Sequence, residues 1–90
     1  MAIIARFQPT NMNADRYAEV MRRLAATGLA APQGRVHHVA FGPTERLQVV
    51  DVWDTPESLQ AFGEHLFPVL ADLGVQIGEP EVQPVHNIVR

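Results

Sequence analysis

Two short segments in the middle of the chain are rich in β-branched and aromatic residues and are separated by Gly42, Pro43, Thr44 and Glu45. The first segment covers residues 36–41 and the second covers residues 47–53. Because a connection this short joins antiparallel neighbours, the pattern predicts a β-hairpin. A helical pattern lies on each side of this hairpin, so the sheet built on it is expected to be covered by helices.

The segment before the hairpin has the spacing of an amphipathic helix. Asn11 and Asn13 are candidate N-caps, and the helix is expected to end near Gly28. Its apolar positions recur at the spacing of one helix face, and they are Tyr17, Val20, Met21 and Leu24.

After the hairpin, Thr55 followed by Pro56 predicts the start of a second helix, since threonine caps helices and proline suits the first helical position. Leucine and phenylalanine continue at helical spacing until Gly74. Pro68 lies inside this pattern, where it removes an amide donor and clashes with the carbonyl of Glu64. The second helix is therefore expected to kink or restart at Pro68.

Two further strands are expected at the ends of the chain. Residues 3–7 alternate between apolar and polar positions, and residues 82–89 form a strand that contains Pro84. Because prolines belong at sheet edges, the last strand is expected at an edge, with the first and third strands in the centre. The order β-α-β-β-α-β is that of an α+β ferredoxin-like fold, and residues 1–90 are expected to form one domain.

Length and composition indicate which kinds of partner such a domain is expected to have. A chain of 90 residues buries only roughly 60–65% of its unfolded surface, so a homodimer is expected. Its seven basic residues are all arginines, scattered through a chain of net charge −3, which argues against nucleic acid as a partner. The chain has no cysteine and no apolar run long enough for a membrane span, so a cytoplasmic location and no membrane association are expected.

Asp51 is the one charged residue on its face of the predicted strand 47–53. A buried carboxylate needs a partner, and a hairpin register that pairs Phe41 with Leu47 sets His37 opposite Asp51. A slip of one residue brings His38 there instead. His37 and Asp51 are thus candidates for a general base and the residue that orients it, and the alternative is a pair that serves only structure.

Four aromatic residues are candidates for a surface that binds a small ligand. The alternative is ordinary core packing between sheet and helices. The candidates are Trp53, Tyr17, Phe62 and Phe67. No metal site is expected, because neighbouring strand residues such as His37 and His38 point to opposite faces of a sheet.

The segment Val50-Asp51-Val52-Trp53-Asp54-Thr55-Pro56 has an acid two residues before a Trp, followed by a capped helix. In this segment, and in its order of elements, the chain resembles the antibiotic biosynthesis monooxygenase-like superfamily. The resemblance implies a dimeric α/β barrel in which two subunits face their sheets together, and cofactor-free oxygen chemistry on small aromatic substrates. The chain has Val49, Phe62 and Phe67 where active members of the superfamily often have Asn and histidines.

Two functions follow as hypotheses. The first is an enzyme that transforms a small aromatic or polyketide-like molecule without a cofactor, with His37 and Asp51 as base and orienter and Trp53 as a stacking surface. The second is a non-catalytic dimer that binds a small ligand or serves only structure.

Overall fold

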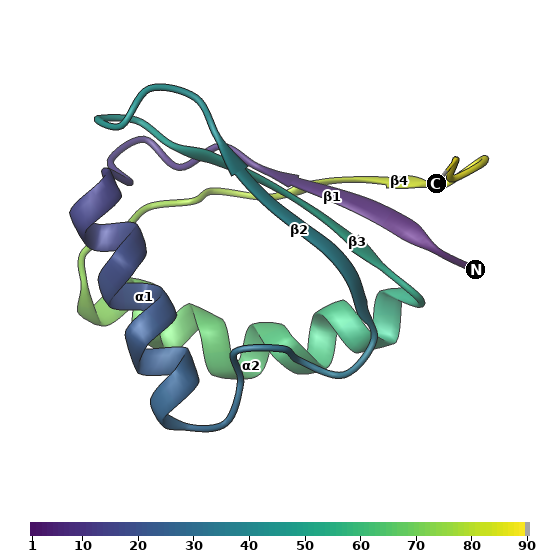
Figure 1. Ribbon diagram of the computed structural model, residues 1–90, viewed down its shortest axis with the longest axis horizontal. Coiled ribbons are helices and arrows are strands. Elements are labelled where there is room, and N and C mark those ends of the chain that lie inside the picture. Colours follow the sequence, from purple (N-terminus) through teal and green to yellow (C-terminus); the bar gives the residue numbers. More distant parts are fainter. Residues whose placement is uncertain (90) are drawn as a thin grey trace.

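The computed structural model describes residues 1–89 and shows one four-stranded sheet with two helices packed on one of its faces (Figure 1). The strands are antiparallel and lie in the order β2-β3-β1-β4. The elements are β1 (Ile3–Phe7), α1 (Ala14–Ala26), β2 (Arg35–Phe41), β3 (Gln48–Trp53), α2 (Pro56–Asp72) and β4 (Glu81–Pro84). The predicted ferredoxin-like order is confirmed, with β1 and β3 in the centre and β4 at an edge.

The strands alternate between a face covered by the helices and an open face. In β1, Ile3, Ala5 and Phe7 are buried, whereas Ile4 and Arg6 are exposed. β3 repeats this pattern, because its buried positions alternate with half-buried ones. The core therefore lies between the covered face and the two helices, where the fully buried Trp53 and Val20 belong to its main cluster.

Both helices begin at the residues that the sequence indicates. The side chain of Asn13 accepts a hydrogen bond from the Arg16 amide at 2.8 Å, and Thr55 accepts one from the Ser58 amide at 3.1 Å. These side chains satisfy amides that have no partner within the first turn of a helix.

The expected division of α2 at Pro68 is wrong, because the helix runs without interruption from Pro56 to Asp72. Both Pro68 and Glu64 are exposed. The Glu64 carbonyl, which Pro68 leaves without its helical donor, therefore lies on the solvent side, where water can replace the lost hydrogen bond.

The last strand is shorter than predicted and ends at Pro84 instead of residue 89. β4 pairs only with β1, and β1 begins at Ile3. The Val85 amide makes a last bond to the Ala2 carbonyl at 2.9 Å. Residues 86–89 lie past the start of β1 in this pairing and form no strand.

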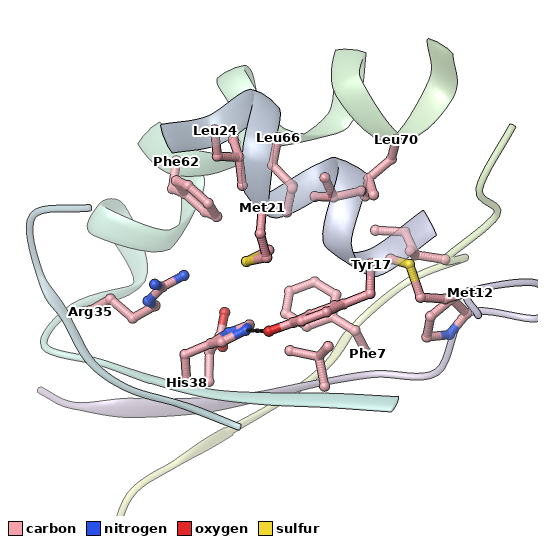
Figure 2. A pocket seen from close by; sticks show the side chains of 15 residues that line it. Phe7, Met12, Tyr17, Met21, Leu24, Arg35, His38, Phe62, Leu66 and Leu70 are labelled. Atoms are coloured by element: carbon pink, nitrogen blue, oxygen red, sulfur yellow. Dashed lines mark hydrogen bonds and ion pairs between the residues drawn. The ribbon is translucent and has the colours of Figure 1, made fainter. Parts of the chain in front are cut away.

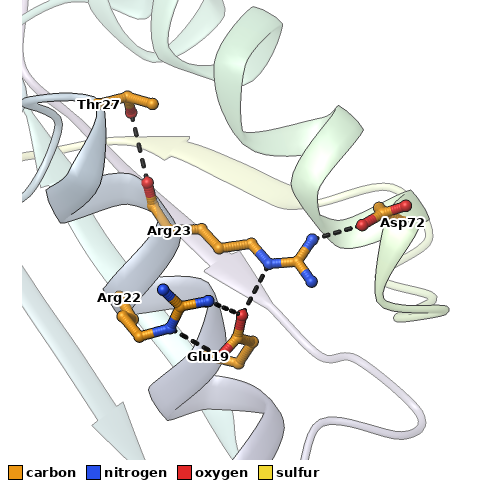
Figure 3. A network of polar contacts seen from close by, with 5 residues as sticks. All are labelled: Glu19, Arg22, Arg23, Thr27 and Asp72. Atoms are coloured by element: carbon orange, nitrogen blue, oxygen red, sulfur yellow. Dashed lines mark hydrogen bonds and ion pairs between the residues drawn. The ribbon is translucent and has the colours of Figure 1, made fainter.

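Polar contacts tie α1 to α2 at the surface (Figure 3). Arg23 of α1 donates to Glu19 on its own helix at 2.8 Å and to Asp72 near the end of α2. Hydrogen bonds from Arg22 and Arg23 lower the pKa of Glu19 to about 2. Neither helix of the described residues is long and apolar enough to cross a membrane.

The open face of the sheet carries apolar side chains that no helix or strand within residues 1–89 covers. Ile4 of β1 and Val39 and Phe41 of β2 are 36%, 52% and 38% exposed. Val50 and Val52 lie opposite members of this group in the strand pairing. We call these five residues the open-face patch.

Candidate functional site

The register of the β2–β3 hairpin decides which histidine meets Asp51. His38 lies opposite Asp51, and His37 lies opposite Val52, so the predicted pairing of His37 with Asp51 is wrong by one residue. The pairing begins at Phe41 and Gln48, because the Leu47 amide bonds to the Met12 carbonyl at 2.7 Å instead of joining the hairpin. Leu47 thus belongs to the turn, and the pairing register between β2 and β3 differs by one residue from the predicted one.

Three polar side chains form a continuous series at the covered face. Nδ1 of His38 lies 2.6 Å from Oδ1 of Asp51, and Nε2 of His38 lies 2.7 Å from the hydroxyl of Tyr17 (Figure 2). Because a carboxylate only accepts hydrogen bonds, Nδ1 of His38 donates to Asp51, and in the neutral imidazole the unprotonated Nε2 then accepts from the Tyr17 hydroxyl. We call Tyr17, His38 and Asp51 the relay.

The relay is well shielded from water. Asp51 is 3% exposed, and 18% of the His38 side chain is exposed. The rings of Tyr17 and His38 are nearly parallel, at 6°, with centroids 6.0 Å apart. Burial raises the pKa of Tyr17, the positive charge of Arg35 lowers it and the negative charge of Asp51 raises it. The neutral phenol is therefore the resting form of this residue.

The relay lines a cavity of about 40 Å³ between the sheet and the helices. This volume holds about three water molecules. The rest of its wall is mostly apolar and includes Phe7, Met12, Met21, Phe62, Leu66 and Leu70 (Figure 2). A proton donor and acceptor series in such surroundings acts without competition from bulk water, which strengthens its electrostatic interactions.

Arg35 also lines this cavity and was not anticipated from the sequence. Its Nη2 donates to the Ala30 carbonyl at 2.9 Å, and its guanidinium carbon lies 5.8 Å from the centroid of the Phe62 ring. Strict alternation from His38 would place Arg35 on the open face. An irregularity in the β2–β3 pairing between Arg35 and His37 sets it opposite Trp53 instead, and no pattern in the sequence marks this irregularity.

The other predicted ligand-binding residues divide into two groups. Tyr17 and Phe62 line the cavity, whereas Trp53 and Phe67 lie outside its wall. Trp53 is fully buried and packs against Phe62, with ring centroids 5.3 Å apart. Phe67 is 47% exposed, because it follows Phe62 by five positions and so points away from the face shared by Phe62 and Leu66.

A second, wider hollow adjoins the cavity. This outer groove has a volume of about 270 Å³ and is lined by Leu29, Pro32, Asp54, Ser58, Phe62 and His65, among others. Phe62 belongs to the walls of both hollows. Within residues 1–89, no three His, Asp or Glu side chains gather closely enough to hold a metal ion.

No family model matches the sequence, and no curated protein matches it. Solved structures do match over almost the whole chain. SnoaB, a cofactor-independent oxygenase from Streptomyces nogalater, is 16% identical with a TM-score of 0.63, and the match covers 98% of this chain and 94% of SnoaB.

Two further structures belong to proteins described as proposed antibiotic biosynthesis monooxygenases. The one from Deinococcus radiodurans is 12% identical over 100% of this chain and 97% of its own, with a TM-score of 0.61. The one from Chloroflexus aurantiacus is 18% identical over 98% of this chain and 95% of its own, with a TM-score of 0.59. At these identities the likeness establishes the fold, and the predicted resemblance to this superfamily is confirmed at that level.

Proposed function

We propose that this chain, whose fold is that of antibiotic biosynthesis monooxygenase-like proteins, is an enzyme that removes a proton from a small aromatic or polyketide-like molecule. One observation carries the proposal: the relay of Tyr17, His38 and Asp51 forms one wall of a cavity whose remaining lining, apart from Arg35, is apolar. The likeness in fold to SnoaB, a cofactor-independent oxygenase, supports cofactor-free oxidation as the overall reaction.

Tyr17 is the residue of the relay that meets the substrate. As the substrate's C–H or O–H proton passes to the Tyr17 oxygen, the phenol proton of Tyr17 passes to Nε2 of His38. The Asp51 carboxylate, which accepts from Nδ1, stabilises the imidazolium that forms. His38 and Asp51 thus act through Tyr17 and need no direct contact with the substrate.

The product of this step is an electron-rich carbanion or enolate. Such an anion can pass an electron to molecular oxygen, which is the oxidant that cofactor-free oxidation requires. An apolar cavity favours this reaction because it excludes the water that would return the proton.

The cavity must widen to admit an aromatic ring, since about 40 Å³ holds only a few waters. Met12 and Met21 line it, and the flexible methionine side chain repacks at low cost. The outer groove on the far side of Phe62 offers the remaining volume. The ligand is therefore expected to displace these side chains on binding.

The proposed working unit is a homodimer in which two open faces pack together. The open-face patch supports this arrangement, because large exposed apolar clusters usually mark an interaction surface. The relay points to the opposite side of the sheet, so each subunit keeps its own cavity.

Anthrone tests the proposal, because its ring CH₂ is acidic and its oxidation by O₂ gives anthraquinone and water. Under nitrogen in D₂O, the wild type should accelerate exchange of the CH₂ hydrogens, as followed by proton NMR. Tyr17→Phe and His38→Gln should slow the catalysed exchange by about 10²–10⁴-fold. In air, O₂ uptake should fall in parallel.

His86→Gln provides the matched control, because His86 is exposed and lies beyond β4. It should exchange anthrone at the wild-type rate. Exchange at the buffer rate with wild-type protein, or an undiminished rate in a folded Tyr17→Phe variant, would contradict the proposal.

The non-catalytic alternative rests on the small inner volume and the completeness of the relay, whose members satisfy one another without a ligand. In that case His38→Gln would lower the free energy of unfolding by about 1–3 kcal/mol and no variant would change anthrone exchange.

A further inference from the structure

Arg35 is a positive charge directed into a mostly apolar cavity, and no described residue serves as its counter-ion. Its guanidinium has five N–H donors, and its one side-chain hydrogen bond to the described residues goes to the Ala30 carbonyl. It forms no ion pair within residues 1–89, whereas Asp51, the only acid in the cavity wall, is held by His38. Figure 2 shows the guanidinium pointing into the space between the sheet and Phe62.

The field of Arg35 reaches the hydroxyl of Tyr17. After the effect of burial, which raises the Tyr17 pKa, Arg35 has the larger of the two charge effects and opposes that of Asp51. At the Tyr17 hydroxyl, a negative charge is therefore favoured by Arg35 and disfavoured by Asp51. The surrounding apolar wall strengthens both effects.

Arg35 also stands where the two hollows meet. Its guanidinium lies over the ring of Phe62, which is part of both walls. Its bond to Ala30 fixes the side chain beside Leu29 and Pro32, which line the outer groove. A ligand that enters from the groove past Phe62 therefore meets this charge before it reaches Tyr17.

We propose that Arg35 is a specificity residue that makes the cavity select aromatic ligands with an acidic ring hydroxyl and binds them as their anions. The ionised oxygen accepts hydrogen bonds from the guanidinium, close to the Tyr17 hydroxyl, whose own proton is bonded to His38, and the ring extends past Phe62. Only the choice of an aromatic ligand rests on the function proposed above. Guanidinium groups suit this task, because they stay charged and offer several donors in a fixed plane.

4-Nitrophenol is the probe, because its anion is yellow and its ionisation is read directly from absorbance. With excess protein, the pKa of the bound probe should fall by about one unit or more, since a nearby opposite charge favours the ionised form by this amount. Arg35→Gln keeps a donor for Ala30 but loses the charge. In this variant the shift should disappear, and the anion should bind about tenfold more weakly for each unit lost.

Three further measurements isolate the charge. Arg46→Gln, which removes an exposed arginine of the hairpin turn, should leave the shift unchanged. Arg35→Lys should keep part of it, and it stands in for Arg35→Gln if the latter does not fold. Nitrobenzene, which has no ionisable group, should bind equally to wild type and Arg35→Gln.

The proposal is overturned if bound 4-nitrophenol shows no lowered pKa in the wild type, if the shift persists in Arg35→Gln, or if nitrobenzene binding is lost with it. Tyr17→Phe tests anion binding separately from proton transfer, because it removes the hydroxyl of the relay and keeps Arg35. A lowered probe pKa without any catalysed anthrone exchange would leave Arg35 as an anion-binding residue and refute the enzyme.

Discussion

The hydroxyl of Tyr17 connects the interior of this protein to a measurable signal, because Tyr17 is the only tyrosine in the chain. Its near-ultraviolet absorbance change on ionisation therefore reports one known group. Burial is the main reason that its pKa is raised, and two charges of opposite sign modify that effect. A titration can thus test both the burial and the charges.

We expect the wild-type tyrosine to ionise above 10.0, the ordinary tyrosine value. Arg35→Gln should raise the pKa further, because it removes the charge that favours the phenolate. Asp51→Asn should lower it relative to wild type, because it removes the charge that disfavours the phenolate. Absorbance titration of the three folded proteins measures these shifts.

The raised pKa of Tyr17 also makes the stability of the fold depend on pH. The pKa of Tyr17 is higher in the folded state than in the unfolded state. Its contribution to the free energy of unfolding is therefore constant below pH 10.0 and is lost as the pH rises through the folded-state pKa. Tyr17→Phe should weaken this alkaline loss. A wild-type tyrosine that titrates at or below 10.0 would contradict the burial.

The sequence predicts that Asp51 needs a hydrogen-bond partner, but it does not predict which histidine is that partner. Asp51 stood out as a charge on an apolar face, and the structure gives it a histidine. The sequence could not decide between His37 and His38, since the two are adjacent in β2, each with a valine on its other side, and the Leu47 bond to Met12 shifts the register. Arg35 was not predicted as a cavity residue, because an irregularity in the β2–β3 pairing moves its side chain from the open face to the covered face.

Among the elements, α2 shows how context overrides a local rule. Proline inside a helix lacks an amide and crowds the preceding turn, yet α2 continues through Pro68. The inner side chains of α2 explain this, because Phe62 and Leu70 are both buried in the core on either side of the proline. Packing keeps the helix in one piece and accepts the local cost.

Pro68→Ala should therefore stabilise the protein. Alanine restores the amide donor to the Glu64 carbonyl at an exposed position and has a higher helix propensity, which together should raise the free energy of unfolding by about 1–3 kcal/mol. Urea denaturation followed by circular dichroism measures this change. An unchanged or lower midpoint would show that the proline contributes more in the unfolded chain than it costs in the helix.

The other elements follow from local chemistry to different degrees. The helix starts at Asn13 and Thr55 were readable because a cap depends on the cap residue and the next turn. The end of β4 was not readable, because it depends on where β1 begins on the other side of the pairing. The length of β4 is set by its partner β1, and the residues of β4 itself therefore do not indicate it.

The molecule as a whole uses the two faces of its sheet differently. One face packs against both helices (Figure 1). The relay lies on this side, and the other face carries the open-face patch. A second copy of the chain covering that patch would give each subunit a second buried layer, which a chain of 90 residues needs more than a larger domain does.

Sedimentation at micromolar concentration should give about twice the chain mass of 10.0 kDa. Val39→Glu should reduce the sedimenting mass toward that of one chain, because it places a charge within the apolar patch. Val82→Glu is the matched control, since Val82 is similarly exposed but pairs with Ala5 on the helix side of the sheet. A wild-type monomer, or equal effects of both variants, would contradict packing through the open face.

The adjacent histidines of β2 have a consequence for how this protein tolerates change over generations. Insertion of one residue in the hairpin turn would rotate β2 so that His37, Val39 and Phe41 replace His38 and Ala40 on the covered face. A histidine would still face Asp51, and no new charge would enter the core. We therefore expect an insertion of one residue in this turn to cause less damage than it would beside a strand that has only one such side chain.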